Sequence, residues 1–188
     1  MCIRDSFLTE EELNAIINKK FDIPRLETVR DIFVFCALSG LAFTDAQHLT
    51  PEHITQDSNG DYWIRKPREK TNNMCNIPLL DIPRMIAEKY KSHPECIKKS
   101  VVLPVPSNQR MNSYLKEIAD VCGIKKTLST HIARHTFACI AIANKVSMES
   151  IAKMLGHSDL RTTKIYAKLM DKTVSEEMNV LKRKFSAV

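Results

Sequence analysis

The chain has 188 residues, of which 44% are hydrophobic, so it can bury one well-packed domain and is short for two. Lysines and arginines number 28 against 22 acidic residues, and the net charge of +6 permits binding to a polyanion without requiring it. No apolar run approaches the roughly 18 to 20 residues of a membrane span, so no membrane association is expected. The six cysteines lack C-x-x-C spacing and several lie in apolar runs, which predicts reduced thiols in a cytoplasmic protein.

The start of the fold is indicated by an abrupt change in the sequence. The segment MCIRDS joins directly to a well-formed helix start, and we expect residues 1–6 to be a non-native or disordered leader. Thr9 and Glu12 have the spacing of a capping box, followed by apolar residues at helical intervals. The domain is therefore predicted to occupy residues 7–188.

The rest of the chain predicts helices around one small sheet. Pro24 and Gly40 fit the beginning and end of a largely buried helix, and Thr44 is expected to cap a short helix after it. Residues 54–80 contain an Asn-Gly turn and apolar segments typical of about three antiparallel strands. Further helical patterns cover residues 81–91, 108–122, 129–144, 148–155, 159–168 and 172–184. The predicted fold class is mainly α with one small antiparallel β-sheet, an α+β arrangement.

A tyrosine and several candidate partners stand in the last third of the chain. In the segment HIARH, His131 and Arg134 are three residues apart and share one face of the predicted helix. His157 lies in the turn between two short helices, where its side chain can point into a cleft. Tyr166 lies on the helix that follows this turn, in the segment GHSDLRTTKIY. These positions supply a nucleophile, a fixed positive charge and titratable groups.

Two more basic residues extend this set toward phosphoryl transfer. Arg68 and Lys70 are two residues apart in the predicted sheet, which would place both on one face of a strand. A tyrosine that attacks a phosphodiester needs cations on the non-bridging oxygens, and the guanidinium groups of Arg134 and Arg68 suit this role. Lys70 would protonate the leaving 5′-oxygen, His131 would accept or position the phenol proton, and His157 would donate a hydrogen bond to the phosphate. This chemistry requires no metal and no other cofactor.

These segments resemble the catalytic domain of tyrosine recombinases, the phage integrase family. The stretch HIARHTFACIAIANKVSMESIAKMLGHSDLRTTKIYAKL is similar to its C-terminal half, with the patterns H-x-x-R, L-G-H and T-x-x-Y. Upstream, LTEEELNAI resembles the usual start of this domain, and KTNNMCNIPL resembles its hairpin lysine segment. The resemblance covers nearly the whole chain. It implies strand cleavage through a covalent 3′-phosphotyrosine, followed by strand exchange and religation.

The resemblance also implies partners and a biological role. Double-stranded DNA would be the substrate, and a tetramer of recombinase protomers would assemble on it. Integration or excision of a mobile element is the expected process. Full-length members carry an N-terminal core-binding domain that this sequence lacks, so weak and salt-dependent DNA binding is expected of the chain alone.

One position departs from the family pattern. The segment SGLAFTDAQHLT aligns with the family segment T-G-L-R-x-S-E-L, and Ala42 stands where the first catalytic arginine belongs. Integrases of Bacteroides conjugative elements resemble the chain in this segment, and some of them use an arginine two residues before the hairpin lysine instead. Arg68 stands at that position, so an active enzyme is expected.

Other interpretations remain open for the same residues. Taken alone, Tyr166 is more often a partly buried helix residue, and Arg68 and Lys70 would be solvated strand charges like Arg65 and Lys66. The segment SMESIAKMLGHSDLRTTKIYAKL also fits a helix-turn-helix regulator that only binds DNA. A third interpretation is a recombinase domain that has lost catalysis, which the alanine in the SGLAF segment would explain.

A zinc site is a further alternative for one of these segments. His131 and His135 are one helical turn apart, but no H-E-x-x-H glutamate or third ligand pattern follows. No metal is therefore expected, and His135 is interpreted as a packing residue.

Overall fold

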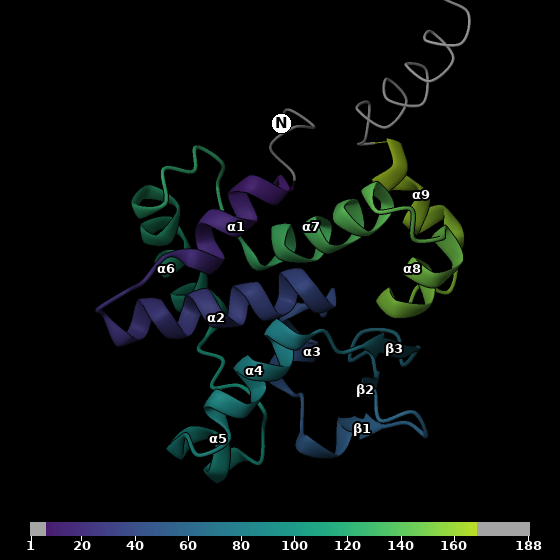
Figure 1. The fold of residues 1–188 in the computed structure, drawn as a ribbon, viewed down its shortest axis with the longest axis horizontal. Coiled ribbons are helices and arrows are strands. Elements are labelled where there is room, and N and C mark those ends of the chain that lie inside the picture. The colour runs from purple at the N-terminus through teal and green to yellow at the C-terminus, as the bar shows by residue number, and fades with distance from the viewer. Residues whose placement is uncertain (1–6, 169–188) are drawn as a thin grey trace, which may run out of the picture.

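The computed structural model describes residues 7–168, and helices make up most of it (Figure 1). Three strands form one antiparallel sheet in the order β1-β2-β3, as predicted: β1 (Ile54–Gln56), β2 (Tyr62–Pro67) and β3 (Met74–Pro78). The helices are α1 (Glu10–Asn18), α2 (Pro24–Ser39), α3 (Phe43–Gln47), the 3-10 turn η2 (Pro51–His53), α4 (Asp81–Tyr90), α5 (Pro94–Lys99), α6 (Asn108–Val121), α7 (Thr130–Ala143), α8 (Met148–Leu155) and α9 (Leu160–Lys168). The expected leader and the expected helix over residues 172–184 lie outside the described residues.

Local capping explains why several predicted helix ends are confirmed. Thr9 Oγ1 accepts a hydrogen bond from the N–H of Glu12, and the Glu12 carboxylate accepts one from the N–H of Thr9. α2 ends at Gly40, whose φ of 72° is left-handed. The expectation for Thr44 was wrong, because Ala42 is the N-cap of α3 and Thr44 lies inside the helix. Burial of this short helix against the core outweighs the capping preference of a threonine.

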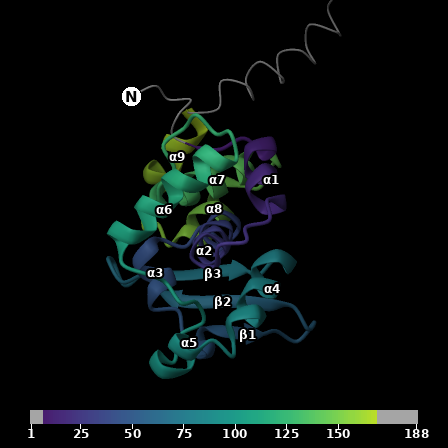
Figure 2. The ribbon, with the colours of Figure 1, turned by 90° about the vertical axis from the view of Figure 1, so that its left-hand side faces the viewer.

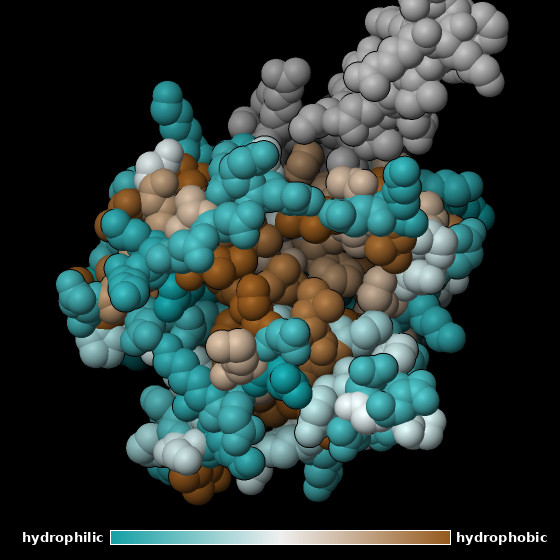
Figure 3. All heavy atoms as spheres, viewed as in Figure 1, coloured by the Kyte–Doolittle hydropathy of each residue, from teal (hydrophilic) through white to brown (hydrophobic). Residues whose placement is uncertain are grey.

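α2 is the central element of the molecule. It packs against α1, α4, α6 and α7, and Figure 2 shows it nearly end-on between the sheet and the α1, α6 and α7 layer. Buried residues occur all around it, including Ile32, Phe33 and Phe35, so it has no solvent-facing stripe. On the face drawn in Figure 3, hydrophobic residues gather over the region of α2 and α7 and hydrophilic residues surround them. No helix within residues 7–168 is long and apolar enough to cross a membrane.

The β2–β3 hairpin differs from its prediction. β2 ends at Pro67, and Arg68 and Lys70 lie in the following turn and not on one face of a strand. The turn is closed by hydrogen bonds from the N–H of Arg68 to Asn73 O and from the N–H of Asn72 to Arg68 O, each 2.9 Å long.

The two charges before this turn have different environments. Arg65 is exposed on the outer face of the sheet, as expected for a solvated strand charge. Lys66 was expected to be solvated too, but it is 3% exposed and its Nζ donates a 2.6 Å hydrogen bond to the Glu69 carboxylate. The alternation of side chains along β2 turns Lys66 inward, and the carboxylate offsets the cost of burying its charge.

Candidate active site

Arg134 is a buried cation that joins two helix ends. It lies on α7, is 5% exposed, and donates 2.6 Å hydrogen bonds from Nη1 to Gly40 O and from Nη2 to Leu155 O. These carbonyls belong to the C-terminal ends of α2 and α8, where the helix dipoles carry partial negative charge. The guanidinium is thus held by two separate parts of the chain, which fixes its position for binding an anion.

His157 follows α8 and contacts Arg134 directly. Its Nε2 lies 3.2 Å from Arg134 Nη2 and must accept this hydrogen bond, because a guanidinium only donates. Its Nδ1 therefore carries the proton and donates to Thr163 Oγ1 at 2.8 Å. Burial, Arg134 and Arg68 lower the pKa of His157 to about 4, so the ring is neutral at pH 7. His157 could donate a hydrogen bond to a phosphate from Nε2 only after Arg134 releases that atom. This donation therefore stays a prediction.

Tyr166 faces inward from α9 and is 6% exposed. Its ring is nearly parallel to that of His157 at 6.3 Å and meets that of His135 edge-on at 5.1 Å between centroids. Burial raises the pKa of the Tyr166 phenol, and the charge of Arg134 together with its hydrogen bond opposes this shift. The phenol is therefore protonated at neutral pH and needs a base to act as a nucleophile.

The histidines on α7 form a short series of ring contacts. His131 is exposed at the start of α7, and its ring centroid lies 4.1 Å from that of His135, which in turn contacts Tyr166. His135 thus packs against the tyrosine, in keeping with its interpretation as a packing residue. Within residues 7–168, no group of three or more His, Cys, Asp or Glu side chains is placed to hold a metal ion.

The hairpin turn brings Arg68 to this cluster. A Cβ placed on Gly156 would lie 2.7 Å from Arg68 Cδ, so the arginine passes directly over the turn that carries His157. Arg134 binds the carbonyl of Leu155, the residue before Gly156, so Arg68 passes close to it, and burial and the charge of Arg68 both lower the pKa of Arg134. Lys70 is exposed at the tip of the turn. The structure therefore gathers Arg68, Arg134, His157 and Tyr166, and leaves Lys70 and His131 at the rim.

Two groups of the site, Asp45 and the carbonyl of Gly40, were not predicted from the sequence. Asp45 is 1% exposed and faces Arg68. Thr163, the threonine of the T-x-x-Y pattern, is fully buried and holds the ring of His157. The signal for Asp45 was its place in the segment SGLAFTDAQHLT, three positions after Ala42 and at the glutamate of the family segment T-G-L-R-x-S-E-L. The carbonyl of Gly40 left no signal, because backbone acceptors do not appear in a motif.

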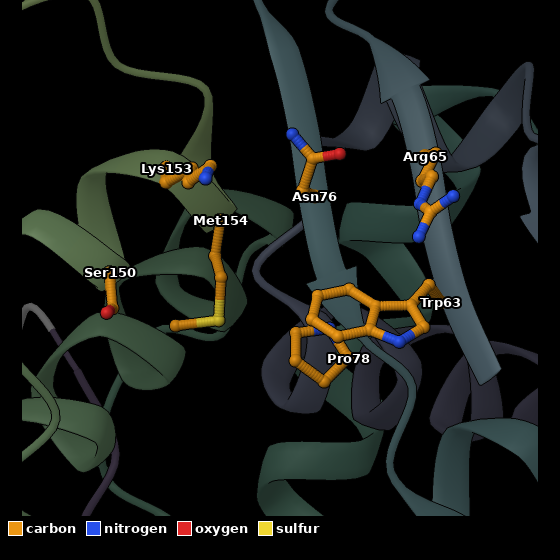
Figure 4. Close-up of a pocket in the computed structure, with 7 residues that line it drawn as sticks. All are labelled: Trp63, Arg65, Asn76, Pro78, Ser150, Lys153 and Met154. Atoms are coloured by element: carbon orange, nitrogen blue, oxygen red, sulfur yellow. The ribbon is translucent and has the colours of Figure 1, made fainter. Parts of the chain in front are cut away.

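A groove of about 470 Å³ lies between α8 and the outer face of the sheet. In Figure 4, Trp63 and Arg65 of β2 and Asn76 and Pro78 of β3 are drawn opposite the side chains of α8. The residues from α8 are Ser150, Lys153 and Met154. Arg65 lines this groove and is not among the contacts of Arg134, so it serves as a control for the arginine in the turn.

Comparison with known protein families gives an extended match. The profile of the phage integrase family matches residues 6–173. A XerD tyrosine recombinase of Staphylococcus aureus (strain Mu50) is 33% identical over 73 residues, which are 39% of this chain and 25% of that protein. A tyrosine recombinase of Pseudothermotoga lettingae is 38% identical over 61 residues, which are 32% and 21% of the two chains. The matched stretches thus span a quarter or less of these curated relatives.

Solved structures share the fold at low sequence identity. XerH site-specific recombinase, in a post-cleavage complex with a palindromic difH substrate, superposes with a TM-score of 0.75 at 17% identity, covering 94% of this chain and 53% of that one. The catalytic domain of bacteriophage HP1 integrase gives a TM-score of 0.62 at 19% identity, covering 97% and 98%. The predicted fold of a tyrosine recombinase catalytic core is confirmed.

Proposed function

Because this chain belongs to the phage integrase family, we propose that it is a tyrosine site-specific recombinase that cleaves and rejoins strands of double-stranded DNA. The observation that carries the proposal is the convergence of Arg134 and His157 on the buried hydroxyl-bearing ring of Tyr166. Three helices bring these residues together, although 32 positions separate Arg134 from Tyr166. A helix-turn-helix regulator does not require a buried guanidinium beside a buried phenol.

The proposed step is a transesterification at phosphorus. The phenol oxygen of Tyr166 forms a bond to the phosphorus, the bond to the 5′-oxygen breaks, and a 3′-phosphotyrosine results. His131 accepts or positions the phenol proton, and Lys70 supplies a proton to the leaving 5′-oxygen. Religation by a 5′-hydroxyl reverses the step, so no external energy source is needed.

Arg134 and Arg68 stabilise the transition state. Arg134 directs N–H groups to Gly40 O, Leu155 O, His157 and Tyr166, which leaves one of its five donors for a non-bridging oxygen. A phosphate in transfer spreads negative charge over several oxygens, which a second guanidinium would share. Arg68 can supply it, because its side chain passes over Gly156, next to the Leu155 carbonyl that Arg134 binds.

The finer assignments belong to the same proposal. Arg68 replaces the arginine absent at Ala42, as in the integrases of Bacteroides conjugative elements that the sequence resembles. The chain acts in integration or excision of a mobile element, in the cytoplasm, as a tetramer of protomers on DNA. Its catalytic domain is assigned to residues 7–188.

The decisive experiment is covalent capture. The protein is incubated with a pool of nicked duplexes of randomised sequence, and DNA that stays attached in denaturant is identified by mass spectrometry of the linked peptide. We expect linkage at Tyr166, loss of the adduct in Tyr166→Phe, and retention of DNA binding by that variant. An adduct that persists in Tyr166→Phe contradicts the proposal, and DNA binding without any adduct in the unmodified protein indicates a decayed recombinase.

The replacement of the arginine absent at Ala42 by Arg68 has its own test. Arg68→Ala should reduce adduct formation nearly as much as Arg134→Ala, whereas the control Arg65→Ala should lower only affinity, because Arg65 faces the neighbouring groove. Adding Ala42→Arg to Arg68→Ala should restore part of the activity. An Arg68→Ala variant that cleaves normally contradicts the replacement.

A further inference from the structure

Asp45 is a buried carboxylate that lies beneath the hairpin turn. It occupies the first turn of α3 and is 1% exposed. Its Oδ1 accepts a 2.8 Å hydrogen bond from the backbone N–H of Glu69, which fastens the β2–β3 turn to α3. Its Oδ2 is buried without a hydrogen-bond partner. A buried charge of this kind is costly unless a cation compensates it.

Arg68 provides that cation in an incomplete contact. Its Nε lies 3.7 Å from Asp45 Oδ2 and, like that oxygen, is buried without a hydrogen-bond partner. The separation is that of an ion pair and is longer than a hydrogen bond. A small rotation of the side chain would convert it into a charge-assisted hydrogen bond and leave both Nη groups of Arg68 for another ligand. Both atoms are therefore available to close this contact.

The positive charges of Arg68 and Arg134 require a carboxylate as counter-ion. Burial and the charge of Arg68 lower the pKa of Arg134, and Asp45 is among the groups that oppose this shift. Two guanidinium groups in a poorly solvated site repel each other, which destabilises both unless an anion lies nearby. Asp31, the other buried acid among residues 7–168, is already engaged with Arg30, Lys89 and Tyr90. Asp45 is therefore the buried carboxylate available to the arginine pair.

From this arrangement we infer that Asp45 is a positioning residue that acts through Arg68. It anchors the Nε of Arg68, directs the rest of the guanidinium toward the phosphate bound by Arg134, and holds the turn that carries Lys70. The inference rests on the proposed function for the identity of the anion, a DNA phosphate. The contact between Asp45 and Arg68 is independent of the proposed function.

The same carboxylate explains how an arginine can change its place in the sequence. Ala42 is the N-cap of α3 and Asp45 lies three residues later, so their side chains leave the first turn near each other. An arginine introduced by Ala42→Arg would therefore reach the anchor that Arg68 uses here. An arginine at position 42 and an arginine at position 68 would then serve the same phosphate, because Asp45 would anchor either one.

A double-mutant cycle tests the inference. Asp45→Asn keeps an oxygen that can accept the hydrogen bond from Glu69 and removes the charge that faces Arg68. The rate of adduct formation at saturating DNA should fall about 10- to 100-fold, as is common when a group that orients a ligand is lost. In the Arg68→Ala background the same change should alter the rate less than about 3-fold, because the effect passes through Arg68. Equal loss in both backgrounds overturns the inference.

Two further measurements separate this idea from a general loss of structure. Asp31→Asn removes a matched buried carboxylate outside the site, and its effect should be the same with and without Arg68. Activity recovered by Ala42→Arg in the Arg68→Ala background should disappear when Asp45→Asn is added, and its persistence contradicts the shared anchor.

Thermal unfolding of the same cycle gives a readout without catalysis. Asp45→Asn should lower the midpoint more in the presence of Arg68 than in its absence, since it leaves two guanidinium groups without their counter-ion. Additive shifts contradict the coupling. If the unmodified protein forms no adduct, the proposed function fails, and the unfolding cycle still decides the role of Asp45.

Discussion

Substitution of Gly156 by alanine tests whether the close packing of the turn positions the catalytic groups. Gly156 ends α8 with a φ of 61°, between the carbonyl that binds Arg134 and the ring of His157. A Cβ there would lie 2.7 Å from Arg68 Cδ and 2.8 Å from Cys75 Sγ, closer than the 3.4 Å at which ordinary contact begins. Because Cys75 is buried on β3, the alanine should displace the Arg68 side chain or the whole hairpin.

The expected loss of stability in Gly156→Ala has two parts. A left-handed conformation costs an alanine about 1 to 2 kcal/mol. Crowding by the added methyl group contributes about 1 to 3 kcal/mol more. Gly123 isolates the first part, since its φ is 69° and a Cβ there would meet nothing within 4 Å. Gly156→Ala should thus be the less stable of the two variants, and a displacement of Arg68 by about 1 Å should reduce cleavage by about 10²-fold.

Urea unfolding and single-turnover adduct formation measure the two effects separately. Gly123→Ala should lose stability from backbone strain alone and cleave at the normal rate under conditions where it is folded. Gly156→Ala should lose more stability and also cleave slowly. If the two variants cleave equally well, the contact between this turn and Arg68 does not position the catalytic groups.

Three more predictions concern individual side chains of the site. Arg134→Ala should reduce cleavage by about 10²- to 10³-fold and also destabilise the fold, because Gly40 O and Leu155 O lose their donor; a loss of only a few-fold would remove Arg134 from catalysis. Lys70→Ala should be rescued by a substrate with a 5′-thiolate leaving group, which needs no proton, and equal impairment on both substrates would mean that Lys70 only binds. The pKa of His157 is lowered from 6.5 to about 4, so the unfolded chain binds the extra proton first and His157 should weaken the fold as pH falls from about 6.5 to 4. The His157→Asn variant should lose this part of the pH dependence of unfolding, and an unchanged profile would contradict the assigned environment.

Features that depend on neighbouring residues could be predicted from the sequence. The capping box at Thr9 and the left-handed Gly40 act within a few residues of the helix ends that they define. The spacing from His157 to Tyr166 could be read in the same way, because a turn and one helix join the two residues. Recognition of the family then followed from motifs that keep these local intervals.

The β2–β3 hairpin departs from the prediction made from its sequence pattern. Alternation along a strand predicted one face for Arg68 and Lys70, but the strand ends at Pro67 and the two residues occupy a turn. Lys66 looked like its exposed neighbour, but the alternation along β2 turns it inward, and Glu69 folds back to pair with its buried charge. A period of two places a side chain only as far as the strand continues, and its end depends on what the hairpin packs against.

The electrostatic arrangement of the site was decided by tertiary structure alone. Arg134 is held by carbonyls 94 and 21 positions away, and Asp45 meets a turn that lies 24 positions later. The sequence determined which groups are present, including the alanine at position 42 and the arginine at position 68. Packing of α2 against α7 and of β3 against α8 decided which charges face one another, because Coulomb and hydrogen-bond energies depend on distance in space and not on separation along the chain.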